Sequence, residues 1–319
     1  MGRLKVSFLS KVVGGKKLFP RKGMINQVPP PSRGRSGGGW GSIMPGSLLS
    51  ASGFFIFFIQ DEHMRFLLTN DDGIYAKGLT TLYHELSRDA ECLVVAPEVE
   101  QSAVGHAITL FRPLMVREAR KNGTALGYAV AGTPADCVKL GIRELAGEPV
   151  DLVVSGINRG ANVGTNVLYS GTVSAATEAV ILGVPSLAIS LDSHKDADFA
   201  FAARFARKMA AFILKHSWKD IAVNVNIPAL PEEEIKGVVV VKQGRARLLE
   251  NFEKRVDPRD NIYYWLAGET QLADDESSDS DACALRQGYI TITPIYYDLT
   301  RYDMLQELGD KVKADKKIF

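Results

Sequence analysis

The chain has 319 residues, of which 46% are hydrophobic and 24% are charged, and its net charge is +1. This composition is typical of a globular protein long enough for a sizeable core, and the near-neutral charge gives no electrostatic argument for binding a nucleic-acid scaffold or a membrane. The three cysteines, Cys92, Cys137 and Cys283, lack metal-site spacing and indicate a reducing compartment without a disulfide framework.

Residues 1–63 differ in composition from the rest of the chain. They contain scattered basic residues, then prolines and glycines, and an apolar patch at 54–59. The patch is far shorter than the roughly 20 residues needed to span a bilayer, and no signal-peptide cleavage pattern precedes Met64. We therefore expect Met64 to be the true start, with residues 1–63 as either an over-extended reading frame or a disordered leader outside the fold, and residues 64–319 as one α/β domain.

From Met64 onwards, short apolar runs alternate with helical patterns. Proline at the first position of one helix, after Thr133 as its N-cap, is a typical helix start. The alternation predicts an α/β fold with a mostly parallel sheet. Strands are expected over residues 66–69, 92–96, 151–155, 186–190 and 222–227, and helices over residues 78–88, 133–145, 172–182 and 198–215.

After Pro231 the pattern changes. We expect a strand over residues 238–241, a hairpin or arm over the aromatic stretch 251–268, and a solvated acidic loop over 274–281. A second strand follows over 288–294, and a basic helix begins near Asp303. Such a region on an α/β core often pairs with another subunit, so residues 235–319 are predicted to contain an oligomerisation arm.

Two adjacent carboxylates, Asp71 and Asp72, follow the first buried strand directly and precede Gly73. In open α/β sheets, ligands bind at the C-terminal edge of the strands. Neighbouring carboxylates repel each other, and a hard cation such as Mg²⁺ or Mn²⁺ relieves that repulsion. The alternative is an Asx-rich turn that only ends a strand.

Two further loops follow buried strands. Ser102 could give a metal its hydroxyl oxygen, or could be a plain loop serine, and His106 is weak support for an acid or base. Asn158 lies in a glycine-containing loop and offers a neutral oxygen, which would complete an all-oxygen site suited to hard divalent cations. The glycine spacing matches neither a dinucleotide-binding loop nor a P-loop.

A fourth polar segment, Ser170-Gly171-Thr172, leads directly into a helix. Hydroxyls and free N–H groups at a helix N-terminus can bind phosphate, although a plain serine N-cap is the commoner use of such a turn. The coincidence of four polar loops at the ends of buried strands favours a functional site.

Several motifs occur in the order found in one family. The chain resembles the SurE family of survival-protein-type, metal-dependent 5′/3′-nucleotidases from Met64 to its C-terminus. The motifs are Asn70-Asp71-Asp72-Gly73, Gln101-Ser102, Gly132-Thr133-Pro134-Ala135-Asp136-Cys137-Val138, Ser155-Gly156-Ile157-Asn158-Arg159-Gly160, Tyr169-Ser170-Gly171-Thr172-Val173, Asn224-Val225-Asn226-Ile227-Pro228 and Gly288-Tyr289-Ile290-Thr291-Ile292-Thr293-Pro294. Ala103 stands where the family often has glycine.

This resemblance implies a Rossmann-like three-layer core, a cytoplasmic location, and a homodimer or homotetramer with exchanged C-terminal arms. It also implies one divalent metal ion per subunit, Mg²⁺ or Mn²⁺, held by Asp71, Asp72, Ser102 and Asn158. The phosphate-binding residues would be Ser170, Gly171 and Thr172, together with Asn158.

The sequence thus predicts metal-assisted hydrolysis of nucleoside 5′- and 3′-monophosphates, with Asp71 and Asp72 as catalytic residues. Two alternatives stay open at this point. One is a phosphatase that forms a phospho-aspartate at Asp71 or Asp72. The other is a non-catalytic, nucleotide-binding regulatory module on the same fold.

Overall fold

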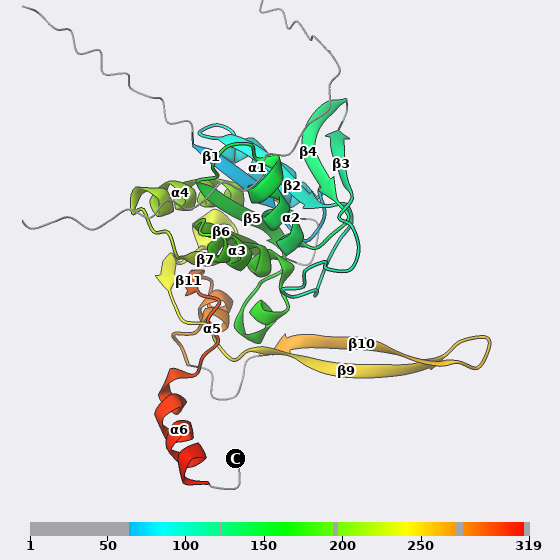
Figure 1. Ribbon diagram of the computed structural model, residues 1–319, viewed down its shortest axis with the longest axis vertical. Helices are drawn as coiled ribbons and strands as arrows, with labels where there is room; N and C mark the ends of the chain where they lie inside the picture. The colour runs from blue at the N-terminus through cyan, green and yellow to red at the C-terminus, as the bar shows by residue number, and fades with distance from the viewer. Residues whose placement is uncertain (1–63, 122, 194–196, 272–276, 316–319) are drawn as a thin grey trace, which may run out of the picture. The chain divides into compact units, whose positions relative to one another are not determined.

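The computed structural model describes residues 64–121, 123–193, 197–271 and 277–315 (Figure 1). The leader expected at residues 1–63 lies outside the described residues. In the part of the chain that the structure describes, no helix is long and apolar enough to cross a membrane.

The main sheet is mostly parallel, as predicted. Within the described residues its strands are β1 (Arg65–Thr69), β2 (Glu91–Pro97), β3 (Val116–Lys121), β4 (Thr124–Val130), β5 (Leu152–Arg159), β6 (Ser186–Asp192), β7 (Ala222–Pro228), β8 (Val238–Val240) and β11 (Ile290–Ile295). Their order across the sheet is β3-β4-β2-β1-β5-β6-β7-β11-β8. The strands from β4 to β7 in this order pair in parallel, while β3 pairs antiparallel with β4, and β11 pairs antiparallel with β7.

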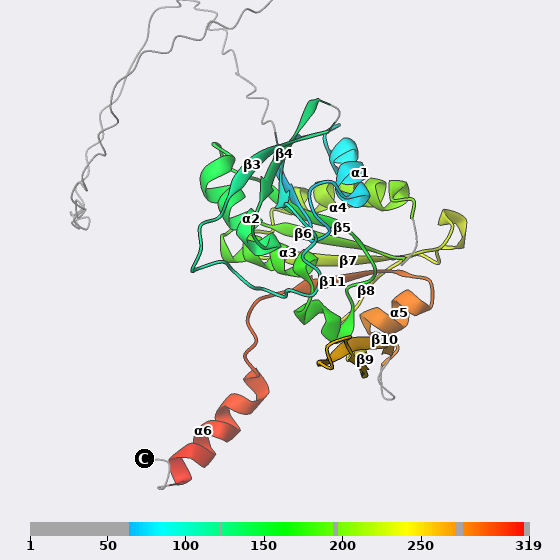
Figure 2. The same cartoon turned by 90° about the vertical axis from the view of Figure 1, so that its right-hand side faces the viewer.

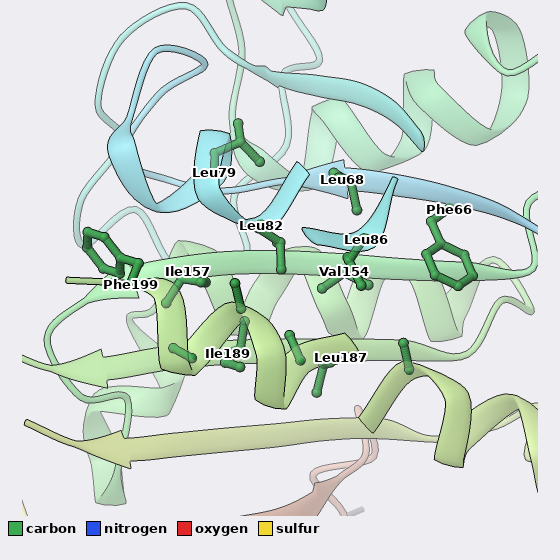
Figure 3. Close-up of a cluster of buried hydrophobic side chains, with 14 of the residues drawn as sticks. Phe66, Leu68, Leu79, Leu82, Leu86, Val154, Ile157, Leu187, Ile189 and Phe199 are labelled. Atoms are coloured by element: carbon green, nitrogen blue, oxygen red, sulfur yellow. The ribbon is translucent and has the colours of Figure 1, made fainter. Parts of the chain in front are cut away.

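The central strands are apolar along their length because helices cover both faces of the sheet. In β1, Phe66 and Leu68 pack into one apolar cluster and Leu67 packs into another. Figure 3 shows the first cluster, in which Leu79 and Leu82 lie over the strands that contribute Leu68 and Val154.

Helices α1 (Lys77–Leu86) and α4 (Ala200–Lys215) cover one face of the sheet, and α2 (Pro134–Leu140) and α3 (Gly171–Ile181) cover the other (Figure 2). The chain is therefore a three-layer α/β fold. As predicted, α2 starts at the Thr133 cap and continues to Leu145, its last turn being a π-helical turn, Gly141–Leu145.

Strand β1 lies between β2 and β5, and the chain leaves it towards β2 first and reaches β5 later. Successive connections thus turn to opposite sides of β1. Such a reversal opens a crevice beyond the C-terminal ends of β1 and β5, and open α/β sheets bind their ligands in a crevice of this kind. Asp71 and Asp72 follow β1 at this point.

The aromatic stretch does form a hairpin, made of β9 (Arg247–Val256) and β10 (Ile262–Gln271), and within the described part of the chain these two strands form a sheet of their own. Figure 1 shows it as a separate two-stranded ribbon. A helix, α6 (Leu305–Ala314), follows in the basic tail, as expected.

The prediction of a solvated loop over residues 274–281 was wrong at its C-terminal end; residues 272–276 lie outside the described residues. Ser280 caps a short helix, α5 (Asp281–Arg286), and Asp281 is fully buried. The Asp281 carboxylate accepts hydrogen bonds from the backbone N–H groups of Gly164 (3.0 Å) and Gly244 (2.9 Å), so these tertiary contacts compensate for burying the charge.

Candidate active site at the end of strand β1

Asp71 joins strand β1 to the N-terminus of α3. Its side chain is buried, and its Oδ1 accepts a hydrogen bond of 2.5 Å from the hydroxyl of Thr172. Burial raises the pKa of Asp71, and the Thr172 hydroxyl and the backbone N–H groups of Thr172 and Gly171 offset part of that rise. The first turn of α3 therefore faces the carboxylate, as a helix N-terminus faces an anion.

Gly171 allows this close approach. A Cβ at this position would lie 2.7 Å from the Cβ of Asp71 and 2.9 Å from its Oδ2. Any larger residue would push the carboxylate away from the helix end. Glycine at 171 is thus required by the contact between strand and helix.

Asp72 lines a pocket of about 240 Å³ together with Lys77, Arg159 and Phe199. Burial, Asp71 and Glu100 raise the pKa of Asp72 to about 6, while the backbone N–H and guanidinium of Arg159 act in the opposite direction. The strand end thus has an excess of negative charge that a cation would neutralise.

Ser102 lies in the loop of residues 98–115, which we call the Ser102 loop. The backbone N–H of Gln101 donates to the carbonyl of Asp71 at 2.7 Å, which fixes this loop beside β1. Ser102 itself is exposed, and its hydroxyl donates to Glu100 at 2.6 Å. Ala103 has a φ of 57°, a left-handed conformation that favours glycine, which is the family's usual residue there.

Asn158 lies near the C-terminal end of β5, next to Arg159, whose backbone contacts Asp72. The strand is irregular here, with a register shift between Ser155 and Asn158 in its pairing with β6. The Nδ2 of Asn158 donates to the carbonyl of Gly160 at 2.8 Å. This contact uses the nitrogen and orients the amide, so the side-chain oxygen is the atom suited to a cation.

The Ser170 side chain is the N-cap of α3, because its hydroxyl oxygen accepts a hydrogen bond from the Val173 N–H at 3.1 Å. Its hydroxyl hydrogen can still be donated to a ligand. The Thr172 hydroxyl hydrogen is used by Asp71. Of the predicted phosphate-binding residues on this turn, Gly171 and Thr172 therefore face the site mainly with their backbone, and Ser170 with its hydroxyl.

These residues fit a hard divalent cation. Among the described residues, no group of three or more His, Cys, Asp and Glu side chains is arranged to hold a metal ion. The donors at the end of β1 are instead two carboxylates, with a hydroxyl on the Ser102 loop and the Asn158 amide in β5. Such all-oxygen sets suit Mg²⁺ and Mn²⁺ rather than zinc. The prediction of a loop at Asn158 was wrong, because β5 continues to Arg159 instead of ending at Ser155.

Sequence reasoning missed Glu100 and Arg159. Both line the pocket and both shift the pKa of Asp72. Their positions in the sequence could have indicated them. Glu100 is two residues before Ser102 and Arg159 directly follows Asn158, and both Ser102 and Asn158 are predicted metal ligands. His106, in contrast, contacts a helix: its ring nitrogens contact Glu178 and Thr177 on α3.

Comparisons with known proteins agree with the motifs and the fold. The family model described as "Survival protein SurE" matches residues 66–250. The 5′-nucleotidase SurE of Syntrophus aciditrophicus is 68% identical over 246 residues, covering 77% of this chain and 92% of that protein. The 5′-nucleotidase SurE of Syntrophobacter fumaroxidans is 50% identical over 247 residues, covering 77% and 98%.

Among solved structures, the SurE protein from Aquifex aeolicus superimposes with a TM-score of 0.67 at 38% sequence identity, covering 77% of this chain and 99% of that one. The family model covers more than half of the chain, and the relatives are matched over almost their whole length. The chain therefore belongs to the SurE family.

Proposed function

We propose that this protein is a metal-dependent 5′-nucleotidase, which hydrolyses nucleoside 5′- and 3′-monophosphates to a nucleoside and phosphate. The curated relatives reported above are named 5′-nucleotidases. The observation that carries the proposal is the 2.5 Å contact between Asp71 and Thr172, which joins one of the two adjacent carboxylates to a helix end suited to binding anions.

The residues that would hold one divalent cation, Mg²⁺ or Mn²⁺, are Asp71, Asp72, Ser102 and Asn158. Such an ion, when bound, neutralises charge on the phosphoryl group and lowers the pKa of bound water. Charge balance at α3 supports this assignment. The Asp71 carboxylate already faces the helix end, so a phosphoryl group at the same place needs additional positive charge between the two anions.

The chain's own groups bind and orient the substrate. The N-terminal turn of α3 presents the hydroxyl of Ser170 and the backbone of Gly171 and Thr172 to the phosphoryl oxygens, and the Asn158 amide adds a neutral polar contact. Asp72, which lines the pocket, can accept a proton from the attacking water. Most of the rate acceleration then comes from positioning and electrostatics.

The test is release of inorganic phosphate from a panel of nucleoside 5′- and 3′-monophosphates with Mn²⁺ or Mg²⁺, and again after EDTA. Activity that depends on the metal is expected. Asp71→Asn should lower the rate at least ~10²-fold, since it removes a charged ligand. Asp89→Asn, at a surface carboxylate paired with Arg207, is the matched control and should keep the rate.

Near-normal turnover of metal-loaded Asp71→Asn would contradict the role of Asp71. Absence of turnover with every substrate would favour the non-catalytic nucleotide-binding module. Hydroxylamine separates the remaining alternative: a phospho-aspartate would give a hydroxamate, whereas direct attack by water gives none.

We also propose that the protein acts in the cytoplasm as a homodimer or homotetramer, with residues 235–319 supplying the arm between subunits. Support comes from the β9–β10 hairpin, on which Phe252, Tyr264 and Trp265 are exposed. Residues 1–63 are proposed to be a leader outside this domain.

A further inference from the structure

Glu178 is a buried carboxylate in α3 that contacts two basic side chains from other parts of the fold. Its side chain is only 4% exposed, and its Oε2 lies 2.8 Å from Nε2 of His106 in the Ser102 loop. Its Oε1 accepts a hydrogen bond from Lys139 in α2. Burial alone would raise the pKa of Glu178, but these two partners lower it below its usual value.

The His106 ring is held at both nitrogens. While Nε2 contacts Glu178, Nδ1 lies 3.3 Å from the hydroxyl of Thr177. The side chain remains one-third exposed, so its position depends on these contacts rather than on a surrounding core. A hydrogen bond to a buried charge is stronger than an ordinary surface contact.

The Ser102 loop has other attachments on both sides of His106. After His106, the carbonyl of Ala107 accepts a hydrogen bond from the Thr133 hydroxyl at 2.7 Å, and Thr109 donates to Asp136 in α2. Before His106, two backbone hydrogen bonds hold the loop. The N–H of Gln101 bonds to the carbonyl of Asp71 at 2.7 Å, and the N–H of Gly105 bonds to the carbonyl of Tyr169 at 3.0 Å. Ser102 lies between the Gln101 and Gly105 hydrogen bonds, and its own hydroxyl donates to another residue of the same loop, Glu100. His106 adjoins the Gly105 hydrogen bond.

Glu178 also lies on the helix that begins at the Ser170 turn. Positions 171 and 178 are seven residues apart, so they lie on the same side of the helix. The contact with His106 therefore ties the Ser102 loop to the helix whose first turn faces Asp71. The Gly105–Tyr169 bond joins the same two segments immediately before that turn.

We propose that His106 and Glu178 form a clamp that positions the Ser102 loop against α3, making both of them positioning residues for the metal and phosphate site. The expected effect on catalysis rests on the proposed function. The clamp itself consists only of side chains of this protein and can be tested separately. In this proposal His106 does not act as an acid or base on the substrate. It determines the position of Ser102.

The test compares three full-length variants. His106→Leu removes the loop's contact with Glu178. His106→Gln places an amide N–H near the position of Nε2 and should restore the contact. Lys139→Met is the matched control, because it removes the other partner of the same carboxylate without touching the loop.

Hydrogen exchange of the Ser102 loop, measured without metal or substrate, is the first readout. His106→Leu should speed exchange of the Gly105 amide and its neighbours at least about tenfold, the effect expected for losing a hydrogen bond to a charged group. His106→Gln should return most of the protection, and Lys139→Met should keep it. Unchanged exchange in His106→Leu, or equal loss in Lys139→Met, would overturn the clamp.

Kinetics give the second readout. His106→Leu should raise the Mn²⁺ concentration for half-maximal activity several-fold, about fivefold or more, with a much smaller change of kcat at saturating Mn²⁺. A loss of kcat alone would instead point to a role in the chemical step and overturn the positioning role. A wild-type protein without phosphatase activity would refute the proposed function, while the exchange measurement would still decide the clamp.

Discussion

At the scale of single residues, the site depends on how closely Asp71 approaches α3. The carboxylate is buried, accepts the Thr172 hydroxyl, and lies against a position where only glycine fits. Its environment is set by a strand and a helix together. A change in either partner should therefore alter the site without changing the fold.

Gly171→Ala tests this approach. The added methyl group would lie 2.7 Å from the Cβ of Asp71 and 3.1 Å from the ring of Pro134, so the carboxylate or the helix has to move. We expect weaker Mn²⁺ binding by calorimetry and a loss of activity of about tenfold or more, because misplaced catalytic groups cost rate steeply.

The control is Gly309→Ala in α6, where a Cβ meets no atom within 4 Å and φ imposes no penalty. That variant should be as active as the wild type and as stable or slightly more stable, since alanine favours a helix over glycine. Normal Mn²⁺ affinity in Gly171→Ala would show that the contact is not needed.

At the scale of secondary-structure elements, Asp136 connects α2 with the Ser102 loop. Its carboxylate accepts hydrogen bonds from the N–H of Thr133, completing a capping box, and from the N–H and hydroxyl of Thr109. Although burial alone would raise the pKa of Asp136, these hydrogen bonds lower it below 3.8, the value in the unfolded chain.

The sign of the resulting pH dependence follows from that depressed pKa. The ionised carboxylate stabilises the fold above about pH 4, and the stabilisation is lost as the pH falls through the lower folded-state value. Asp136→Asn should reduce the free energy of unfolding by about 1 kcal/mol at pH 7, as for other helix caps.

Urea unfolding at pH 7 and at pH 3 measures this difference. The difference should shrink at the lower pH, because the unfolded chain, in which the pKa of this carboxyl is higher, takes up the proton first. An equal difference at both pH values would mean that the charge on Asp136 contributes nothing.

The elements that could be predicted from sequence are those whose local signals agree with their tertiary surroundings. Strand β1 is apolar on both faces, and α2 has a threonine cap followed by proline, so both were recognisable. The β3–β4 hairpin was not predicted, because Val116–Lys121 is largely charged and exposed. Asp281 looked like part of a solvated run because its partners, Gly164 and Gly244, are far away in sequence.

For the site, sequence could place four polar loops at one edge of the sheet but could not give their contacts. The hydrogen bond between Thr172 and Asp71 spans 101 positions, and no local pattern indicates it. The roles of Glu100 and Arg159 around Asp72 likewise depend on how the Ser102 loop and the end of β5 meet in space.

At the scale of the whole molecule, the β9–β10 hairpin exposes large apolar side chains to solvent. On one face of the hairpin Ile262, Tyr264 and Leu266 are exposed, with Phe252 paired opposite Leu266, and on the other face Trp265 is 58% exposed. A two-stranded hairpin is marginally stable alone, and contiguous exposed apolar side chains mark interaction surfaces.

We therefore expect Trp265→Lys to weaken self-association. Sedimentation of the purified protein should show a shift from the oligomer towards monomer in this variant. Lys254→Ala on the facing strand, a polar position of the same hairpin, should leave the distribution unchanged. If Trp265→Lys sediments like the wild type, the hairpin is not the contact between subunits.

The central claim is that the end of β1 and the first turn of α3 form one metal and phosphate site. A crystal grown with Mn²⁺, measured at a wavelength where manganese scatters anomalously, tests it most directly. We expect an anomalous peak bound by Asp71 and Asp72, with the Asn158 and Ser102 oxygens around it. A peak elsewhere on the protein, with none at these two aspartates, would contradict it.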